Sequence, residues 1–319
     1  MKNDIFAEIN KIGLLPQFDL KENLDPVSLA EALSRASLPC AEIGFSPDAE
    51  PHIKAITSKL PDFIIGVRGV KDVEALKRAV SAGAKFFTGF DGEGELGRYC
   101  LENDIPFIPS CSTAGEIEAA LQEGLTTVKF FPAEQAGGLS ALKTLGEAYP
   151  EVKFLLGGVS EEDFVKYADY EKVIGFCAPW LMPAKAVKEG DFAQMEALAR
   201  ANVSKMLGFF LKHVGINSAD EKESNATADA FEKLFGFKKQ DFGGAYFNDT
   251  FVEVMKKPFY GRHGHIAIGV NNMERALYRF RKAGVAFIEE SAGYNPDGSL
   301  RVIYFKEEIG GFAVHIVQK

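Results

Sequence analysis

The sequence predicts an α/β protein in which a (β/α)₈ TIM barrel is followed by a smaller α+β domain of two βαβββ modules. Short apolar strand candidates alternate with helical patterns from residue 14 to about residue 180. After a polar helix that starts at Asp191, residues 211–319 contain a weak internal repeat instead. At 319 residues the chain is long for one hydrophobic core, so two domains are expected, over 1–205 and 211–319.

Eight apolar segments of the first domain are expected to be strands. They are LLPQFDL (14–20), AEIGF (41–45), FIIGVR (63–68), AKFFTGF (84–90), PFIPSCS (106–112), TTVKFFPA (126–133), KFLLGG (153–158) and VIGFCA (173–178). Helix start signals lie between them, at Asp25-Pro26, at Thr113 with Glu116, and at Ser160. Strands that alternate with helices pair in parallel, which favours a closed barrel and leaves an open doubly wound sheet as the alternative.

Composition and charge exclude some classes of function. The formal net charge is −9, whereas nucleic acid or an anionic membrane would require a basic face, so neither is expected as a partner. The N-terminal segment has no apolar signal region, and no apolar run of roughly 18 residues occurs, so a cytoplasmic protein is expected. The cysteines are far apart and lie in or beside apolar runs, which predicts buried free thiols at Cys40, Cys100, Cys111 and Cys177.

Two ionisable residues stand inside apolar strands of the predicted barrel. Lys129 lies in TTVKFFPAE and Glu42 lies in CAEIGF. An inward lysine is desolvated, which lowers its pKa and exposes a neutral amine for attack on a carbonyl. An inward carboxylate needs a partner or a chemical task. Together they predict a Schiff-base nucleophile with a proton shuttle, and the alternatives are a lysine that snorkels at a strand end and a structurally paired glutamate.

The segment LTTVKFFPAEQAGG, with AEIGF and IPFIPSCST before it and LLGGVS and APWLMP after it, resembles the 2-keto-3-deoxy-6-phosphogluconate/4-hydroxy-2-oxoglutarate (KDPG/KHG) aldolase family. The similarity runs from about residue 5 to residue 200. The resemblance implies a homotrimeric class I aldolase of carbohydrate metabolism that cleaves a 4-hydroxy-2-keto acid to pyruvate and an aldehyde, without a metal or organic cofactor. It places the Schiff base on Lys129, the general acid/base on Glu42, and Phe131 against the bound keto acid.

Residues that hold the substrate in that family are changed here. Ser46 replaces a carboxylate-binding arginine, and Pro179 replaces a phosphate-holding serine, which removes a hydroxyl and a backbone donor. Gly157 and Gly158 remain and are expected to offer backbone N–H groups at a helix N-terminus. Arg68, at the end of the third strand, is a candidate carboxylate clamp, or else a surface arginine. Further changes fall at strand ends: Gly69, Thr88 and Gly89. A Schiff-base lyase or decarboxylase acting on another 2-keto acid therefore remains an alternative.

Residues able to bind a metal recur at matching places in the two halves of residues 211–319. The first strand of each half carries His213 (KHVGIN) or His265 (GHIAIGV), and the last strand carries Glu253 (TFVEVMK) or His315 (FAVHIVQ). Imidazole and carboxylate ligands suit a divalent transition metal such as zinc, nickel, iron, cobalt or manganese. The alternative for each histidine is a hydrogen-bonded core residue.

These residues, 211–319, resemble the vicinal-oxygen-chelate superfamily, which includes glyoxalase I. The resemblance implies two βαβββ modules that form a cupped sheet around the metal, and its last ligand is commonly glutamate where this chain has His315. The leading prediction is an aldolase fused to a metal-binding domain, with a small keto acid as the substrate. The alternative for the second domain is a metal-free ligand-binding or assembly module.

Overall fold

The computed structural model describes residues 5–19, 24–89 and 94–319. The chain divides into two compact units, Met1–Met206 and Leu207–Lys319. No helix in these described ranges has the length and apolar character needed to cross a membrane. All four cysteines are buried and free, as expected.

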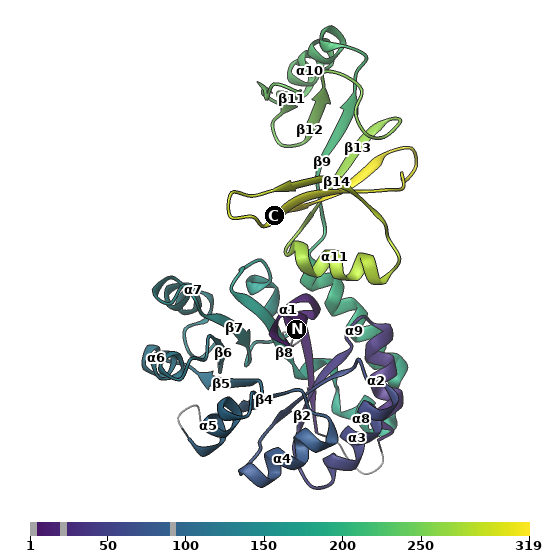
Figure 1. Ribbon diagram of the computed structural model, residues 1–319. Coiled ribbons are helices and arrows are strands. Elements are labelled where there is room, and N and C mark those ends of the chain that lie inside the picture. Colours follow the sequence, from purple (N-terminus) through teal and green to yellow (C-terminus); the bar gives the residue numbers. More distant parts are fainter. Residues whose placement is uncertain (1–4, 20–23, 90–93) are drawn as a thin grey trace. The chain divides into compact units, whose positions relative to one another are not determined.

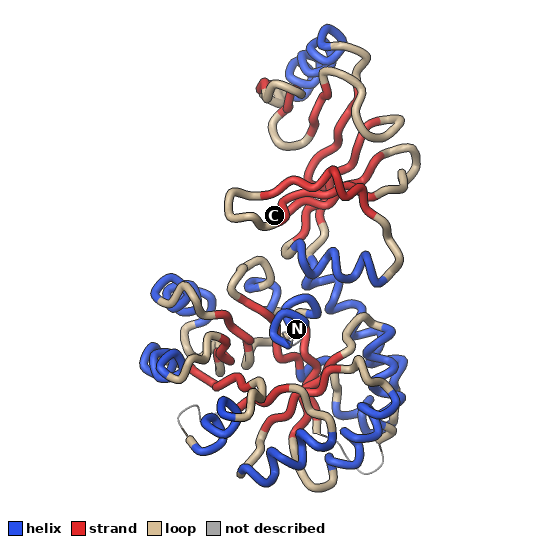
Figure 2. The backbone as a smooth tube through the Cα atoms, in the orientation of Figure 1, coloured by secondary structure: helices blue, strands red, loops and turns tan. Residues whose placement is uncertain are grey.

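The first unit is a closed barrel of eight parallel strands, with helices between successive strands on its outside (Figures 1 and 2). Its strands are β1 (Leu14–Phe18), β2 (Cys40–Gly44), β3 (Ile64–Arg68), β4 (Phe86–Gly89), β5 (Phe107–Cys111), β6 (Thr127–Phe130), β7 (Lys153–Leu156) and β8 (Val173–Ala178). The first strand pairs with both β2 and β8. This closure confirms the predicted barrel and excludes the open sheet.

All but one of the helices expected from sequence signals are present in this unit. Its helices are α1 (Ile5–Ile12), α2 (Pro26–Arg35), α3 (Ala49–Lys59), α4 (Val73–Ala82), α5 (Glu95–Glu102), α6 (Ala114–Gln122), α7 (Gly138–Ala148), the 3₁₀ turns η1 (Phe164–Tyr167) and η2 (Pro179–Leu181), α8 (Ala184–Glu189) and α9 (Phe192–Leu207). Asp25 caps α2, and Thr113 and Glu116 form the predicted capping box of α6.

The expected helix after Ser160 is the exception, because only the short 3₁₀ turn η1 forms there. The Ser160 hydroxyl does accept a hydrogen bond from the Asp163 N–H, at 3.0 Å. The fully buried Phe164 ring then packs against Phe176 and Trp180, with ring centroids 5.3 and 5.5 Å away. These contacts draw the chain onto the barrel after one turn, so a capping signal is present without a helix long enough to follow it.

A large aromatic side chain fills the barrel interior beside Glu42. Glu42 pairs in register with Gly66, and Gly66 pairs with Phe86, so the three positions are neighbours across β2, β3 and β4. Phe86 is fully buried, and a Cβ added to Gly66 would lie 2.0 Å from its ring. Gly66 therefore makes room for the ring that closes the barrel interior at this level.

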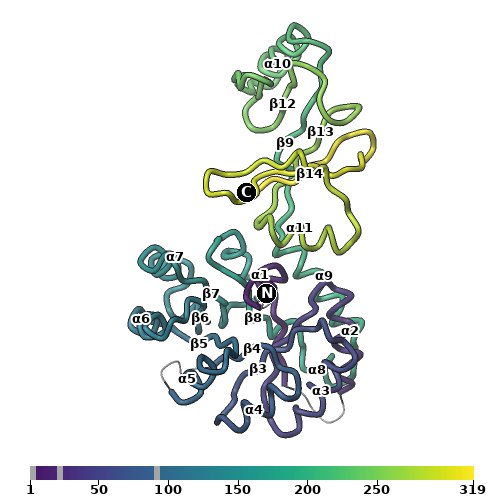
Figure 3. Tube along the Cα trace, in the orientation of Figure 1, coloured from purple at the N-terminus to yellow at the C-terminus, as the bar shows by residue number. Residues whose placement is uncertain are grey.

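The second unit is one sheet made from two modules that follow each other along the chain (Figure 3). The first contains β9 (Phe210–Asn217), α10 (Glu221–Phe235), β10 (Lys239–Asp241), β11 (Ala245–Asn248) and β12 (Val252–Met255). The second contains β13 (Gly264–Val270), α11 (Met273–Lys282), β14 (Phe287–Tyr294), β15 (Leu300–Phe305) and β16 (Ala313–Gln318). The strand order is β10-β11-β12-β9-β13-β16-β15-β14, so β9 and β13 meet antiparallel at the centre. The repeat predicted from sequence is present in the fold.

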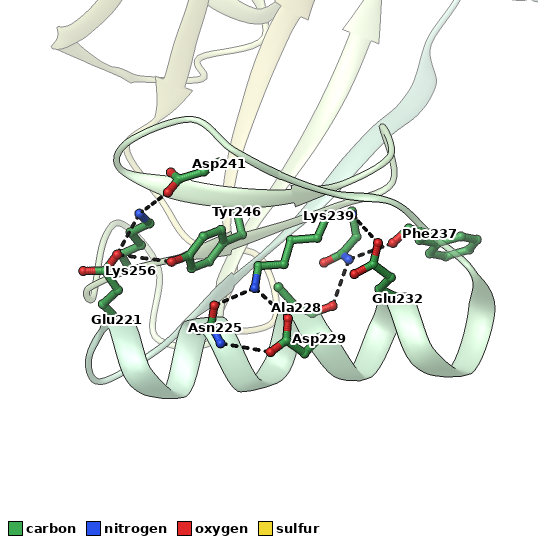
Figure 4. Close-up of polar contacts among 11 residues, drawn as sticks. Glu221, Asn225, Ala228, Asp229, Glu232, Phe237, Lys239, Asp241, Tyr246 and Lys256 are labelled. Carbon is green, nitrogen blue, oxygen red and sulfur yellow. Dashed lines mark hydrogen bonds and ion pairs between the residues drawn. The ribbon is translucent and has the colours of Figure 1, made fainter.

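Ion pairs attach α10 to one face of the first module (Figure 4). The Lys239 ammonium contacts Asp229 at 2.6 Å, and the Lys256 ammonium contacts Glu221 at 2.8 Å. Both ammonium groups also lie over the ring of Tyr246, at 4.6 and 4.3 Å from its centroid. Side chains alternate along β12, so this packing of one strand face directs Glu253 to the other face.

The Gly66 contact predicts an asymmetric response to two glycine substitutions. Gly66→Ala should destabilise the protein by about 1–3 kcal/mol, because the added methyl group overpacks Phe86. The control is Gly115→Ala in α6, where nothing lies within 4 Å of the added Cβ, and it should leave stability unchanged or slightly raised. Thermal and urea unfolding of both variants measure this difference, and equal stability would contradict the packing described here.

Candidate functional site

The barrel brings together the two ionisable residues predicted to act as a pair. Lys129 of β6 and Glu42 of β2 lie 87 residues apart in sequence, and the Lys129 Nζ stands 3.4 and 3.3 Å from the two carboxylate oxygens of Glu42. Lys129 is 7% exposed and Glu42 is 0% exposed. Both side chains therefore point into the barrel, and the lysine does not snorkel to solvent.

Two further residues bind Glu42 and were not assigned a role from the sequence. The Thr88 hydroxyl of β4 donates to Glu42 Oε1 at 2.6 Å and lies 3.5 Å from Lys129 Nζ. The Gln17 side-chain amide of β1 donates to Glu42 Oε2. Gln17 is the one polar residue of the strand LLPQF, which was the available signal, whereas Thr88 stood out only as a change from a family pattern. Each carboxylate oxygen of Glu42 thus has a neutral donor besides the lysine.

The expected lowering of the Lys129 pKa is not what the structure shows. Burial lowers the pKa of the Lys129 ammonium, but the neighbouring acidic groups, Cys177 and Glu42, together outweigh burial and raise it above its ordinary value. Burial in turn raises the pKa of the Cys177 thiol to about 12. The prediction was wrong because it counted desolvation and not the acidic groups beside the amine, of which the Glu42 carboxylate lies at 3.3 Å.

Lys129 opens onto a cavity of about 590 Å³ that also exposes Phe131 and Gly157. The Phe131 ring centroid lies 5.9 Å from Lys129 Nζ. A Cβ on Gly157 would stand 3.2 Å from Lys129 Cε and 3.0 Å from the Phe131 ring. The absence of a side chain at Gly157 therefore leaves room for Lys129 and Phe131.

The two glycines do not provide the predicted pair of amide donors at a helix N-terminus. The Gly157 N–H donates to the Phe130 carbonyl oxygen at 3.1 Å, and the first helical turn after these glycines is η1, which begins only at Phe164. Gly158 instead turns the chain, with φ +74°, where a Cβ would stand 3.0 Å from Pro132. Sheet pairing therefore already uses the Gly157 donor, and the role of the two glycines in substrate binding stays a prediction.

Arg68 lines the cavity at the end of β3, as expected, but its guanidinium has a partner. Its Nη2 lies 2.8 Å from the Asp19 carboxylate, and its Nε lies 3.9 Å from Glu42. Ser46 accepts a hydrogen bond from the Ala49 N–H at 3.2 Å and so belongs to the start of α3. The negative charge of Asp19 partly offsets the positive charge of Arg68, which weakens the attraction of Arg68 for an anion in the cavity.

In the second unit, the three predicted histidine ligands form one cluster, and the predicted ligand Glu253 contacts two of them. Glu253 Oε2 lies 3.0 Å from His265 Nε2 and 3.1 Å from His213 Nε2, and the two histidine nitrogens are 3.2 Å apart. His315 joins them, since one ring nitrogen from each histidine lies within 4.8 Å of the others. Four ligands held tetrahedrally at about 2.1 Å from one metal ion stand roughly 3.4 Å from each other, and the spacings among His213, His265 and Glu253 are close to this value.

The pairing register explains why residues so far apart in sequence converge. Across β9 and β13, His213 pairs with Ala267 and His265 pairs with Gly215. Glu253 of β12 pairs with that same Gly215, and His315 of β16 pairs with that same Ala267. A twofold axis between β9 and β13 therefore exchanges His213 with His265, and Glu253 with His315.

The protonation and hydrogen bonding of this cluster suit a cation. Neither ring nitrogen of His315, nor Nδ1 of His265, has a hydrogen-bond partner among the described residues, although all three atoms are buried. Burial lowers the pKa of His315 to about 3, so its ring is neutral. One of its two nitrogens is therefore an acceptor. Burial raises the pKa of Glu253, but hydrogen bonds from His213 and His265 have the larger opposite effect and lower it to about 2. The carboxylate is therefore charged. Unpartnered buried nitrogens beside a carboxylate fit a metal ion.

Comparison with known proteins gives the first unit a family. A family model described as "KDPG and KHG aldolase" matches residues 5–198. The 2-dehydro-3-deoxy-phosphogluconate aldolase of Treponema pallidum is 33% identical over 198 residues, which cover 61% of this chain and 94% of that protein.

Solved structures agree with this match. The 2-keto-3-deoxy-6-phosphogluconate aldolase of Zymomonas mobilis ZM4 is 28% identical with a TM-score of 0.57, and covers 62% of this chain and 94% of its own. The KDPG aldolase of Legionella pneumophila is 27% identical with a TM-score of 0.58, and covers 61% of this chain and 97% of its own. The described barrel and the family match together make the protein an aldolase, a carbon–carbon lyase, and the chain belongs to the KDPG and KHG aldolase family.

Proposed function

We propose that the barrel cleaves a 4-hydroxy-2-keto acid to pyruvate and an aldehyde through a Schiff base on Lys129, with Glu42 as the proton shuttle. The observation that carries this proposal is the buried contact of 3.3 Å between the two side chains at the wall of a cavity. The names of the relatives support the substrate class, and the Legionella pneumophila enzyme is described with pyruvate captured as a covalent carbinolamine intermediate.

The ion pair supplies the proton transfers that this reaction needs. Lys129 first passes a proton to Glu42, and its neutral amine adds to the C2 carbonyl of the keto acid. The added nitrogen gives a second proton to the former carbonyl oxygen, and Glu42 returns the first, so that the oxygen leaves as water and the iminium forms. The Glu42 carboxylate then removes the 4-hydroxyl proton while the C3–C4 bond breaks, and the bonding electrons enter the iminium as an enamine. The aldehyde leaves, C3 takes the proton back, and water releases pyruvate and the free amine.

The partners of Glu42 suit both of its protonation states. A carboxylate accepts hydrogen bonds, whereas a carboxylic acid also donates one. Thr88 and Gln17 each carry a group that donates and one that accepts, so each can bind Glu42 before and after it takes a proton. A lyase that decarboxylates another 2-keto acid is the second candidate, and turnover of 4-hydroxy-2-oxoglutarate to pyruvate and glyoxylate separates the two.

We also propose that residues 211–319 form a vicinal-oxygen-chelate domain that binds one divalent transition metal through His213, Glu253, His265 and His315. The unpartnered buried ring nitrogens of His315 support this proposal. Three nitrogens and one carboxylate favour zinc, nickel, iron, cobalt or manganese over calcium and magnesium, which prefer oxygen ligands. A bound ion of this kind acts as a Lewis acid on a keto or enediolate oxygen.

Lys129 should be the residue that pyruvate labels. Treatment with pyruvate and borohydride should add a stable mass to the peptide containing Lys129, and Lys129→Ala should abolish the addition. Because the raised pKa keeps the amine protonated at neutral pH, the trapping rate should rise as pH increases. Peptide mass mapping reads out the site. Labelling at another lysine, or none between neutral and alkaline pH, would reject the Schiff-base proposal.

Thr88 should affect turnover through its hydroxyl rather than its shape. Thr88→Val removes a 2.6 Å hydrogen bond to a charged group, worth about 1.5–3 kcal/mol, and should lower kcat by roughly 10- to 100-fold with little change in KM. Thr88→Ser keeps the hydroxyl and should restore most of the rate. Steady-state kinetics of both variants test this. Equal losses in the two variants would indicate a packing role instead.

Metal content should depend on the four-residue cluster and not on histidine number. The double variant His213→Ala/His265→Ala should bind no zinc, nickel, cobalt, iron or manganese under conditions in which the parent protein binds one ion. The control is His263→Ala, because His263 is exposed and lies outside the cluster. Elemental analysis and the metal-dependent rise in Tm are the two readouts. Undiminished metal content in the double variant, or no binding by the parent, would favour the metal-free module.

A further inference from the structure

The cavity at Lys129 has a second, apolar end that the proposed reaction steps do not use. Side chains from four consecutive elements form it, and we call this end the apolar lobe: Leu76 of α4, Phe87 of β4, Leu96 and Cys100 of α5, and Phe107 of β5. The catalytic end contains Lys129, Thr88 and Gly157. The whole cavity measures about 590 Å³, within the range of about 300–1,000 Å³ that is typical of pockets for drug-sized ligands. Pyruvate alone is much smaller than such a ligand.

The end of β4 is where the cavity passes from the barrel interior to the helix layer. Thr88 reaches Glu42 inside the barrel, so the neighbouring Phe87 points outward to α4 and α5. The strand ends at Gly89, which has no side chain and lines the cavity. A Cβ at this position would already touch the Phe107 ring, at 3.5 Å, so a larger residue would narrow the passage.

The five residues of the apolar lobe carry no charge. The charged residues among the described lining of the whole cavity are Arg68, Lys71 and Lys129, and Arg68 is paired with Asp19 at 2.8 Å. A phosphate buried among the side chains of the lobe would lose hydration without an ion pair to any of these five residues, which is unfavourable, whereas a hydrocarbon group would gain from leaving water.

We propose that the apolar lobe binds the part of the substrate that leaves as the aldehyde, and that this part is an alkyl or aryl group and not a phosphorylated polyol. The inference rests on the proposed aldolase function, because it takes Lys129 as the point to which the keto acid is attached. The chain beyond C4 then extends past Gly89 into the lobe.

Aldol addition of pyruvate to a series of aldehydes tests this specificity with the full chain. From ethanal to hexanal, kcat/KM should rise by about fourfold for each methylene group, because each one enters the lobe. Hexanal should also exceed D-glyceraldehyde 3-phosphate. A rate that does not change with chain length, or a preference for the phosphorylated aldehyde, would overturn the proposal.

Substitution in the lobe should change the length preference without affecting attachment to Lys129. Leu96→Asp should lower kcat/KM for hexanal by at least tenfold relative to ethanal, and leave borohydride trapping of pyruvate unchanged. Leu101→Asp is the matched control, because Leu101 is on the same helix, is also partly buried, and does not line the cavity. If Leu96→Asp does not fold, Leu96→Trp should fill the lobe and shift the optimum to shorter aldehydes. An unchanged ratio of hexanal to ethanal in the folded variant would overturn the proposal.

A binding measurement separates failure of the lobe from failure of the aldolase proposal. Lys129→Ala cannot form a Schiff base, so calorimetry with this variant compares 2-oxooctanoate with pyruvate by non-covalent affinity alone. The 2-oxooctanoate should bind at least a hundredfold more tightly than pyruvate. Equal affinities would overturn the proposed binding of alkyl groups in the apolar lobe, even if borohydride traps pyruvate on Lys129 in the parent protein. Tighter octanoate binding without trapping in the parent protein would support the lobe and reject the Schiff base.

Discussion

The buried ion pair between Lys129 and Glu42 is the interaction on which the barrel site depends. A single charge inside the barrel would be strongly unfavourable, and removal of one partner from a buried pair typically costs about 3–5 kcal/mol. Each charged side chain therefore stabilises the buried charge of the other. Thr88 and Gln17 complete the hydrogen bonding of the carboxylate, and Phe86 with Gly66 fills the interior next to it. The Lys129 amine is consequently held as an ammonium ion, and a proton acceptor lies within the same pair.

The second unit stabilises its polar cluster in a different way. It has three imidazoles and one carboxylate at a point where two strand pairs are related by a twofold axis. Hydrogen bonds from His213 and His265 satisfy Glu253, whereas the His315 ring nitrogens have no such partner in the described part of the chain. The barrel pair is internally balanced, and this cluster leaves acceptor nitrogens available.

Sequence patterns predicted the features that depend on periodicity. Eight apolar segments became the eight barrel strands, and the repeat in residues 211–319 became two modules of equal topology. The partners Lys129 and Glu42 were predictable because a charged residue in an apolar strand requires compensation. The repeat similarly predicted that His213, Glu253, His265 and His315 would converge, since equivalent strand positions meet across a twofold axis.

Features that depend on distances between strands were not predictable. The direction of the Lys129 pKa shift depends on two neighbours from other strands, Cys177 and the Glu42 carboxylate at 3.3 Å, which no local pattern in β6 reveals. Pairing of Arg68 with Asp19 likewise joins the ends of β3 and β1. Gly157 could not be excluded as an amide donor until its pairing with Phe130 was known. Ser160 carries a genuine capping hydroxyl, but the packing of Phe164 ends the helix after one turn.

The twofold relation between Glu253 and His315 also determines the charge balance of the cluster. Two carboxylates at these equivalent positions would neutralise a divalent cation, whereas one carboxylate and one neutral imidazole leave one positive charge uncompensated. An anionic ligand such as a carboxylate or an enolate would complete the neutralisation, and a neutral carbonyl compound would not. Under the proposed metal binding, the difference between these twofold-related positions would favour an anionic ligand, such as a small organic acid, over a neutral one.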